Sequence, residues 1–126
     1  QAAVCPAPSA AESAPAKGRR ADRELKAIEA RWRQEKSRRT APLRARADDL
    51  LSRIEAAEQE VTELDAALAR PETYDDHARA RELADRQREL KAQLERSLVP
   101  EWERTSLEME ELERELDGQR PRPRDD

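Results

Sequence analysis

The stretch LRARADDLLSRIEAAEQEVTELDAAL, residues 43–68, decides the fold, because its apolar side chains recur in an unbroken heptad pattern. The steps alternate between four and three residues at Leu43, Ala47, Leu50, Ile54, Ala57, Val61, Leu64 and Leu68. Such spacing puts the apolar residues on one stripe of a helix, which then packs against a second helix. Pro42 suits the first turn of this helix, and proline at position 71 ends it. The pattern therefore predicts one coiled-coil arm over residues 43–70.

A second arm follows a short turn at residues 71–76. Thr73, with Asp76 three residues later, resembles a capping box and predicts that a helix starts directly after it. Two successive four-residue steps interrupt the heptads of this arm and form a stutter with Pro100 inside it, so a bend is expected there. The second arm is predicted over residues 77–117. Its seam is expected at Ala80, Leu83, Gln87, Leu90, Leu94, Leu98, Trp102, Thr105, Met109, Leu112 and Leu116.

The distribution of charge favours an antiparallel hairpin within one chain. Residues 17–46 have a net charge of +8, residues 47–77 of −8, residues 78–98 of +2 and residues 99–117 of −6. When the chain folds back at Tyr74, the acidic block of the first arm faces the basic block of the second. Exposed ion pairs contribute only a few tenths of a kcal/mol each, but their pattern selects register and direction. The predicted register places Ile54 beside Leu94 and Ala47 beside Trp102, and the hairpin is expected to be monomeric.

The composition is typical of long, solvated helices rather than of a layered fold. Leu, Ile, Val and Phe together number 18 of 126 residues, whereas Ala, Glu, Lys, Leu and Arg number 79. The sequence predicts an all-α fold, a two-helix antiparallel coiled-coil hairpin over residues 19–117. A flexible Ala/Pro/Ser linker is expected over residues 1–18, a basic stem helix over residues 22–40 and a disordered tail over residues 118–126. With two glycines, the chain lacks the tight turns of phosphate-binding loops, and no stretch is apolar enough to cross a membrane. A soluble cytoplasmic protein follows by default.

The candidate functional residues lie in the basic stem helix. Arginines contact phosphates well, and a tryptophan beside them is suited to stack on a base. The alternative is that this basic run pairs with the acidic residues 101–117 and that the tryptophan packs in the stem. His77 next to two aspartates is interpreted as part of a helix cap rather than a metal site, and Cys5 as an incidental thiol. No catalytic, cofactor or metal residue is assigned, and the predicted nucleic-acid-binding residues are Arg31, Trp32, Arg33, Lys36, Arg38 and Arg39.

Several motifs together resemble the C-terminal coiled-coil domain of ABC-F ATPases, over about residues 36–117. They are Ala41-Pro-Leu-Arg44, Ile54-Glu-Ala-Ala-Glu58, the turn LARPETYDD from Leu68 to Asp76, Glu101-Trp-Glu103 and Glu110-Glu-Leu-Glu113. The resemblance implies an Ala- and Pro-rich linker after an ATPase cassette, followed by a hairpin. It also implies a ribosome-associated translation factor that uses ATP and Mg²⁺ in cassettes outside this chain, and a C-terminal domain that contacts ribosomal RNA or DNA. Pro100 departs from the family's uninterrupted second helix.

Two other interpretations remain open at this point. One is the RNA-binding helical arm of valyl-tRNA synthetases, which the linker, the PETY turn and the late Trp102 disfavour. The other is a structural or dimerising coiled coil without a nucleic-acid role. The sequence does not decide which ABC-F subgroup is present or which nucleic acid is contacted.

Overall fold

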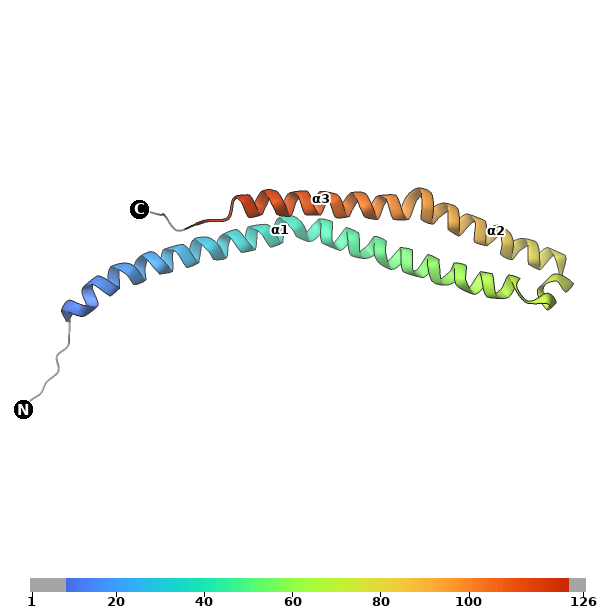
Figure 1. Cartoon of the computed structure of the whole chain (residues 1–126), viewed down its shortest axis with the longest axis horizontal. Coiled ribbons are helices and arrows are strands. Elements are labelled where there is room, and N and C mark those ends of the chain that lie inside the picture. Colours follow the sequence, from blue (N-terminus) through green and yellow to red (C-terminus); the bar gives the residue numbers. More distant parts are fainter. Residues whose placement is uncertain (1–8, 123–126) are drawn as a thin grey trace, which may run out of the picture. The chain divides into compact units, whose positions relative to one another are not determined.

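The structure is a computed structural model that describes residues 9–122, with side chains from residue 17 onwards. Every element within these residues is helical (Figure 1). The order is α1 (Ser9–Leu68), a short 3-10 helix η1 (Pro71–Asp75), α2 (His77–Gln93), one π-helical turn η2 (Leu94–Leu98) and α3 (Val99–Gly118). The long helices pack as a hairpin, which confirms the predicted all-α fold class.

Two compact units make up the chain. The hairpin unit runs from Thr40 to Leu112, and the stem unit combines the residues up to Arg39 with those from Glu113 onwards. Each unit pairs a part of α1 with segments that follow the turn at residues 71–75, and Figure 1 shows these segments side by side.

The core of the hairpin unit is the predicted heptad seam. The buried residues that form one cluster are Leu50, Ile54, Ala57, Leu64, Leu90 and Leu98, with Val61, Leu83, Leu94, Val99 and Trp102 packed against them. Ala47 and Ala80 are also buried. Small side chains recur among the large ones, so the two arms approach closely and interdigitate. The ion pair between Glu60 Oε2 and Arg86 Nε, at 2.6 Å, links the arms in the direction that the charge blocks predict.

The π-helical turn η2 explains how the stutter of the second arm is accommodated. Up to Leu94 the seam has regular heptad spacing, and from Leu98 on it has the same spacing shifted by one residue. A π-helical turn contains one extra residue, here closed by a hydrogen bond from the Val99 N–H to the Leu94 carbonyl. The extra residue keeps Leu98 and Thr105 on the buried face, where both are found. Pro100 is the second residue of α3, directly after the π-helical turn.

Side chains at the tip satisfy the backbone groups that the helix ends leave open. The hydroxyl of Thr73 donates to the Ala67 carbonyl at 2.5 Å, and the hydroxyl of Tyr74 donates to the Leu68 carbonyl at 2.7 Å. Asp76 caps α2, because its carboxylate accepts the Arg79 N–H at 3.1 Å. The predicted start of the second arm is therefore correct, but the predicted role of Thr73 is not, since Thr73 closes the end of α1 instead.

The first helix differs from the sequence-based boundaries at two places. It continues through Pro42, where separate stem and arm helices were expected. Proline removes the hydrogen bond to the carbonyl four residues earlier, here that of Arg38. Arg38 and Pro42 are both exposed, while Thr40 and Ala47 on either side of Pro42 are buried. The helix also begins at Ser9, inside the segment expected to be a linker, as its high alanine content allows. Residues 1–8 and 123–126 of the predicted linker and tail lie outside the described residues.

Candidate nucleic-acid interface

The stem unit is built around Trp32 of α1 and the end of α3. The indole Nε1 of Trp32 donates a hydrogen bond to the Leu116 carbonyl at 2.9 Å, and Leu116 itself is 2% exposed. The same carbonyl accepts the Gln119 N–H at 3.0 Å. A carbonyl oxygen has two lone pairs, so the Leu116 carbonyl accepts both the turn that ends α3 and the indole of Trp32. Trp32 thereby anchors the end of α3 on α1.

Two cations lie over the ring of Trp32. Lys36 Nζ is 5.4 Å from the ring centroid, and the guanidinium carbon of Arg120 is 5.5 Å from it. Lys36 also forms an ion pair with Asp117, at 2.6 Å between Nζ and Oδ1. Both cations are attracted by the electrons of the ring and by the negative end of α3. Of the six predicted site residues, Trp32 and Lys36 thus make contacts within the stem unit, as the packing alternative anticipated.

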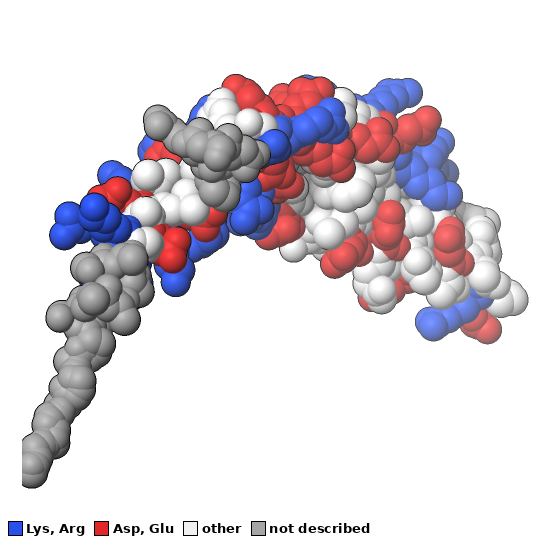
Figure 2. Space-filling view, turned by 60° about the vertical axis from the view of Figure 1, so that its left-hand side comes forward, with Lys and Arg blue, Asp and Glu red and all other residues white. Residues whose placement is uncertain are grey.

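The four predicted arginines are exposed, and their charges are neutralised to different degrees. Arg38 Nη2 lies 2.5 Å from Glu35 Oε1, in an ion pair one turn apart on α1. Arg33 Nη1 reaches Glu29 Oε2 at 4.0 Å. Arg31 has no ion pair within residues 17–122. Figure 2 shows lysine and arginine side chains on the surface of this part of α1, with acidic side chains between them.

Helical geometry divides these arginines between faces. Arg31 and Arg38 are seven residues apart, which places them two turns apart on one face of α1. Arg33 follows Arg31 by about 200° of helical rotation, so it lies on the opposite side. The structure brings Arg31, Arg38 and the neighbouring Arg39 towards one side, and separates Arg33 from them.

The electrostatics around Glu35 follow from its arginine neighbours. The hydrogen bond from Arg38 lowers the pKa of the Glu35 carboxyl, and the charges of Arg38 and Arg39 lower it further. The same hydrogen bond raises the pKa of Arg38. Glu35 therefore remains ionised at neutral pH and holds Arg38 in place, while Arg39 acts on the same carboxylate through its charge.

Arg120 is a residue of this region that the sequence analysis did not single out. It was assigned to a disordered tail, whereas its guanidinium lies against Trp32 and its N–H donates to the Asp117 carbonyl at 3.2 Å. The alternation of Arg and Pro after Gly118 was the available signal, because it marks a basic segment that leaves the helix.

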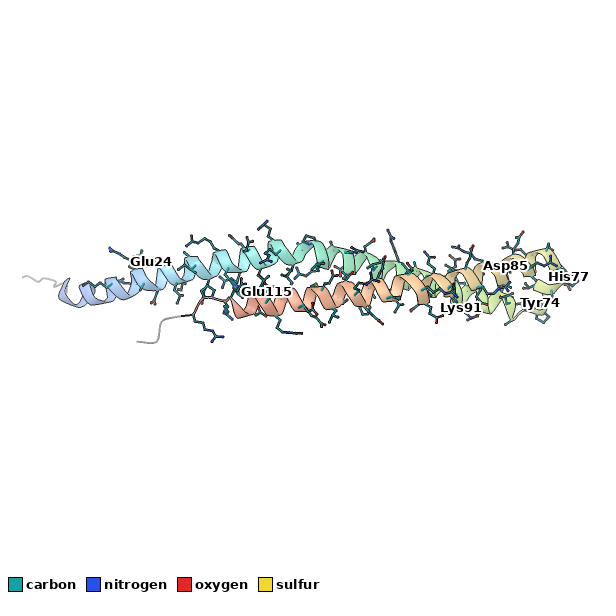
Figure 3. All side chains as sticks on the ribbon, turned by 90° about the horizontal axis from the view of Figure 1, so that it is seen from above. Glu24, Tyr74, His77, Asp85, Lys91 and Glu115 are labelled. Carbon is teal, nitrogen blue, oxygen red and sulfur yellow. The ribbon has the colours of Figure 1, made fainter. Side chains whose placement is uncertain are left out.

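The other candidate residues have structural surroundings. His77 is exposed at the tip of the hairpin, near Tyr74 (Figure 3), as the first residue of α2 after the Asp76 cap. Within the described residues, no three His, Cys, Asp or Glu side chains are grouped so as to hold a metal ion. In the same part of the chain, no helix has the length and apolar character needed to span a membrane. Cys5 lies outside the described residues.

Comparison with known proteins places the hairpin unit in a family. The model of the ABC transporter C-terminal domain family matches residues 40–104, which is slightly more than half of the chain. The match begins at the first residue of the hairpin unit and ends near Pro100 and Trp102, so it includes the tip and the π-helical turn. The candidate residues 31–39 precede it. No curated protein and no solved structure gave a match. The heptad seam, the PETY tip and the family match agree, and the chain belongs to the ABC transporter C-terminal domain family, which is typical of ABC-F proteins.

Proposed function

We propose that this domain is a non-catalytic appendage of an ABC-F ATP-binding protein and that its basic stem contacts nucleic-acid phosphates. The observation that supports this most directly is the charge of residues 17–39, which contain ten basic and four acidic side chains. The proposed contacts are Arg31, Arg38 and Arg39, which are exposed towards one side of α1, whereas Arg33 lies on the opposite side. Guanidinium groups pair with phosphate oxygens through two parallel hydrogen bonds, so exposed arginines are suited to this role.

Trp32 and Lys36 complete the proposed surface in a different way. Trp32 holds the end of α3 through its hydrogen bond to Leu116, and Lys36 is paired with Asp117. In this proposal both residues position the stem, and the arginines around them make the phosphate contacts. Because α1 and α3 are joined here, loss of the Trp32 anchor disturbs the surface without removing any arginine.

Contacts of this kind are weak and independent of base sequence. Two or three neutralised phosphates release as many counterions, which gives a shallow dependence of affinity on salt. Within a parent protein that is already docked on a ribosome, a weak contact becomes effective through high local concentration. The proposed setting is therefore the cytoplasm, with ribosomal RNA or DNA as the partner and regulation of translation as the process served.

The direct test is binding of the full chain to structured RNA and to duplex DNA at low and moderate salt. The variant with Arg31, Arg38 and Arg39 all changed to Glu should lose binding to both polymers while its far-ultraviolet circular dichroism is unchanged. A comparison of the two polymers decides whether RNA or DNA is preferred.

A matched control makes the same change of charge on the hairpin unit. Arg81, Arg96 and Arg104 are exposed there, and their replacement by Glu changes the net charge equally. The control variant should retain most of the affinity of the unchanged chain. Equal losses in both variants would mean that only total charge matters, and no binding by the unchanged chain at low salt would refute the proposal.

A purely structural or dimerising coiled coil is the second candidate, because the tryptophan and lysine of the basic run are engaged in packing. In a monomeric hairpin the seam residues of the two arms contact each other within one chain, whereas in a dimerising coiled coil they contact a second chain. Cysteines introduced at Ile54 and Leu94, with Cys5 changed to Ala, should crosslink within a single chain if the hairpin is monomeric. Crosslinks that join two chains, together with a dimer mass in sedimentation equilibrium, would favour the dimerising coiled coil.

A further inference from the structure

The segment that follows α3 returns to the stem instead of leaving it. The helix ends at Gly118, and the next two N–H groups, of Gln119 and Arg120, donate to the carbonyls of Leu116 and Asp117. These two hydrogen bonds form a turn at the end of the helix. The turn places the guanidinium of Arg120 5.5 Å from the centroid of the Trp32 ring. Arg120 therefore lies beside Trp32 of the stem part of α1.

The contact with Trp32 leaves the hydrogen-bonding capacity of Arg120 unused. A guanidinium has five N–H donors, and a contact with the electrons of a ring 5.5 Å away occupies none of them with a hydrogen-bond acceptor. No carboxylate within residues 17–122 forms an ion pair with Arg120. The ring thus fixes the position of the cation, while its donors stay available to an external acceptor.

The charges around Trp32 add to this effect. Lys36 lies over the same ring but is neutralised by Asp117, so the unpaired charge at this point is that of Arg120. Arg122, two residues further on, is exposed, and no ion pair within the described part of the chain involves it. Glu113 and Glu115 in the last turns of α3 oppose these charges, which limits the site to a few contacts. A phosphodiester group suits such cations, because its oxygens accept two parallel hydrogen bonds from one guanidinium.

We propose that Arg120 and Arg122 bind nucleic-acid phosphates together with the stem arginines, and that Trp32 positions Arg120 for this contact. The inference rests on the proposed function and extends it: the phosphate-binding surface is formed by two segments at opposite ends of the chain. The stem helix supplies one segment, and the turn after α3 supplies the other. A site of this kind forms only when the end of α3 is anchored on α1.

The test compares the full chain with the double variant Arg120→Gln/Arg122→Gln, using structured RNA and duplex DNA in parallel. Loss of two phosphate contacts reduces the slope of log affinity against log salt by about 1.8. The variant should therefore lose about tenfold less affinity than the unchanged chain between 50 and 200 mM salt. The matched control Arg81→Gln/Arg104→Gln, on the hairpin unit, should leave the slope unchanged. RNA and DNA titrations identify which polymer supplies the phosphates.

A double-mutant cycle tests the positioning role of Trp32. Trp32→Leu removes the ring, so Arg120→Gln should reduce affinity in the unchanged chain but have little further effect in the Trp32→Leu chain. A merely structural role of Trp32 would lower helicity or stability and leave the effect of Arg120→Gln as large as before. In a Trp102→Phe background, Trp32 is the remaining tryptophan, and its emission should change when RNA or DNA is added.

The outcomes separate this inference from the proposed function. Binding by the unchanged chain with the same salt slope in Arg120→Gln/Arg122→Gln would overturn the two-segment surface and leave the stem contacts standing. Absence of binding by the unchanged chain at low salt would refute both. The inference is supported if Arg120→Gln/Arg122→Gln reduces the slope of log affinity against log salt and if the effects of Trp32→Leu and Arg120→Gln on affinity are not additive.

Discussion

Replacement of Ile54 by alanine should destabilise the hairpin unit by about 2–3 kcal/mol. Ile54 is 6% exposed and belongs to the buried cluster of the seam, between Leu50 and Ala57 on α1. The substitution removes three carbon atoms from this cluster, at about 0.8 kcal/mol for each buried methylene group. A residual cavity adds to this cost. The higher helix propensity of alanine returns a few tenths of a kcal/mol, and the arms of a two-helix hairpin relax more easily than a globular core.

Chemical and thermal unfolding followed by circular dichroism measures the change. The free energy of unfolding should fall by the amount given above, and the melting temperature by roughly 10–20 °C for a unit of this size. Leu107→Ala is the matched control, because Leu107 lies on α3 of the same unit but is 53% exposed. The control should cost less than about 1 kcal/mol. Equal effects of the two substitutions would refute the assignment of the seam.

Three further predictions concern the π-helical turn, the cap of α2 and the pH dependence of binding. Deletion of Ser97 in a Pro100→Ala background should retain most of the stability, because it restores regular heptad spacing in the second arm. Deletion of Glu82 in α2, which breaks regular spacing, should unfold the hairpin. Thermal melts followed by circular dichroism compare the two deletion variants. Asp76→Ala should lower the unfolding free energy by about 0.5–2 kcal/mol through loss of the cap, and Asp76→Asn should restore most of it in the same melts. The pKa of Glu35 is lowered by its arginine neighbours. The pairing of Glu35 with these arginines is therefore fully present at any pH above the ordinary pKa of a glutamate, and it is lost only as the pH falls through the lowered pKa. Nucleic-acid affinity should therefore be flat between about pH 6 and 8, and Glu35→Gln should raise it about threefold at low salt, as measured by fluorescence anisotropy; a loss of affinity in Glu35→Gln would contradict this assignment.

The seam and the tip of the hairpin could be predicted from the sequence because both depend on local patterns. Heptad spacing determines which side chains share a helix face, and the structure finds the predicted positions buried or half-buried along both arms. Even the π-helical turn is visible in the sequence as a shift of one residue between Leu94 and Leu98. The role of Thr73 was predicted wrongly, because two residues of one turn compete to cap two helix ends and only their positions decide between them.

Pro42 marks the limit of such local rules. A proline at the start of a heptad run is equally compatible with the first turn of a new helix and with a helix that continues. In the structure, the buried residues on both sides, Thr40 and Ala47, favour continuation, and α1 runs through this point. Burial is a property of the packed arms, so the local sequence did not determine this boundary.

The sequence by itself determined the all-α hairpin and its family motifs, since both follow from residues close together along one helix or turn. Only the tertiary structure decided which basic residues of the candidate site pack within the stem unit and which are exposed. The hydrogen bond from Trp32 to the Leu116 carbonyl joins residues 84 positions apart, and Arg120 reaches the same ring after the end of α3. Composition gives the basic charge of the stem, but it does not say which cations are used in packing. That division depends on where the end of α3 meets α1, because Asp117 neutralises Lys36 there and leaves Arg31 and Arg120 exposed to the surroundings.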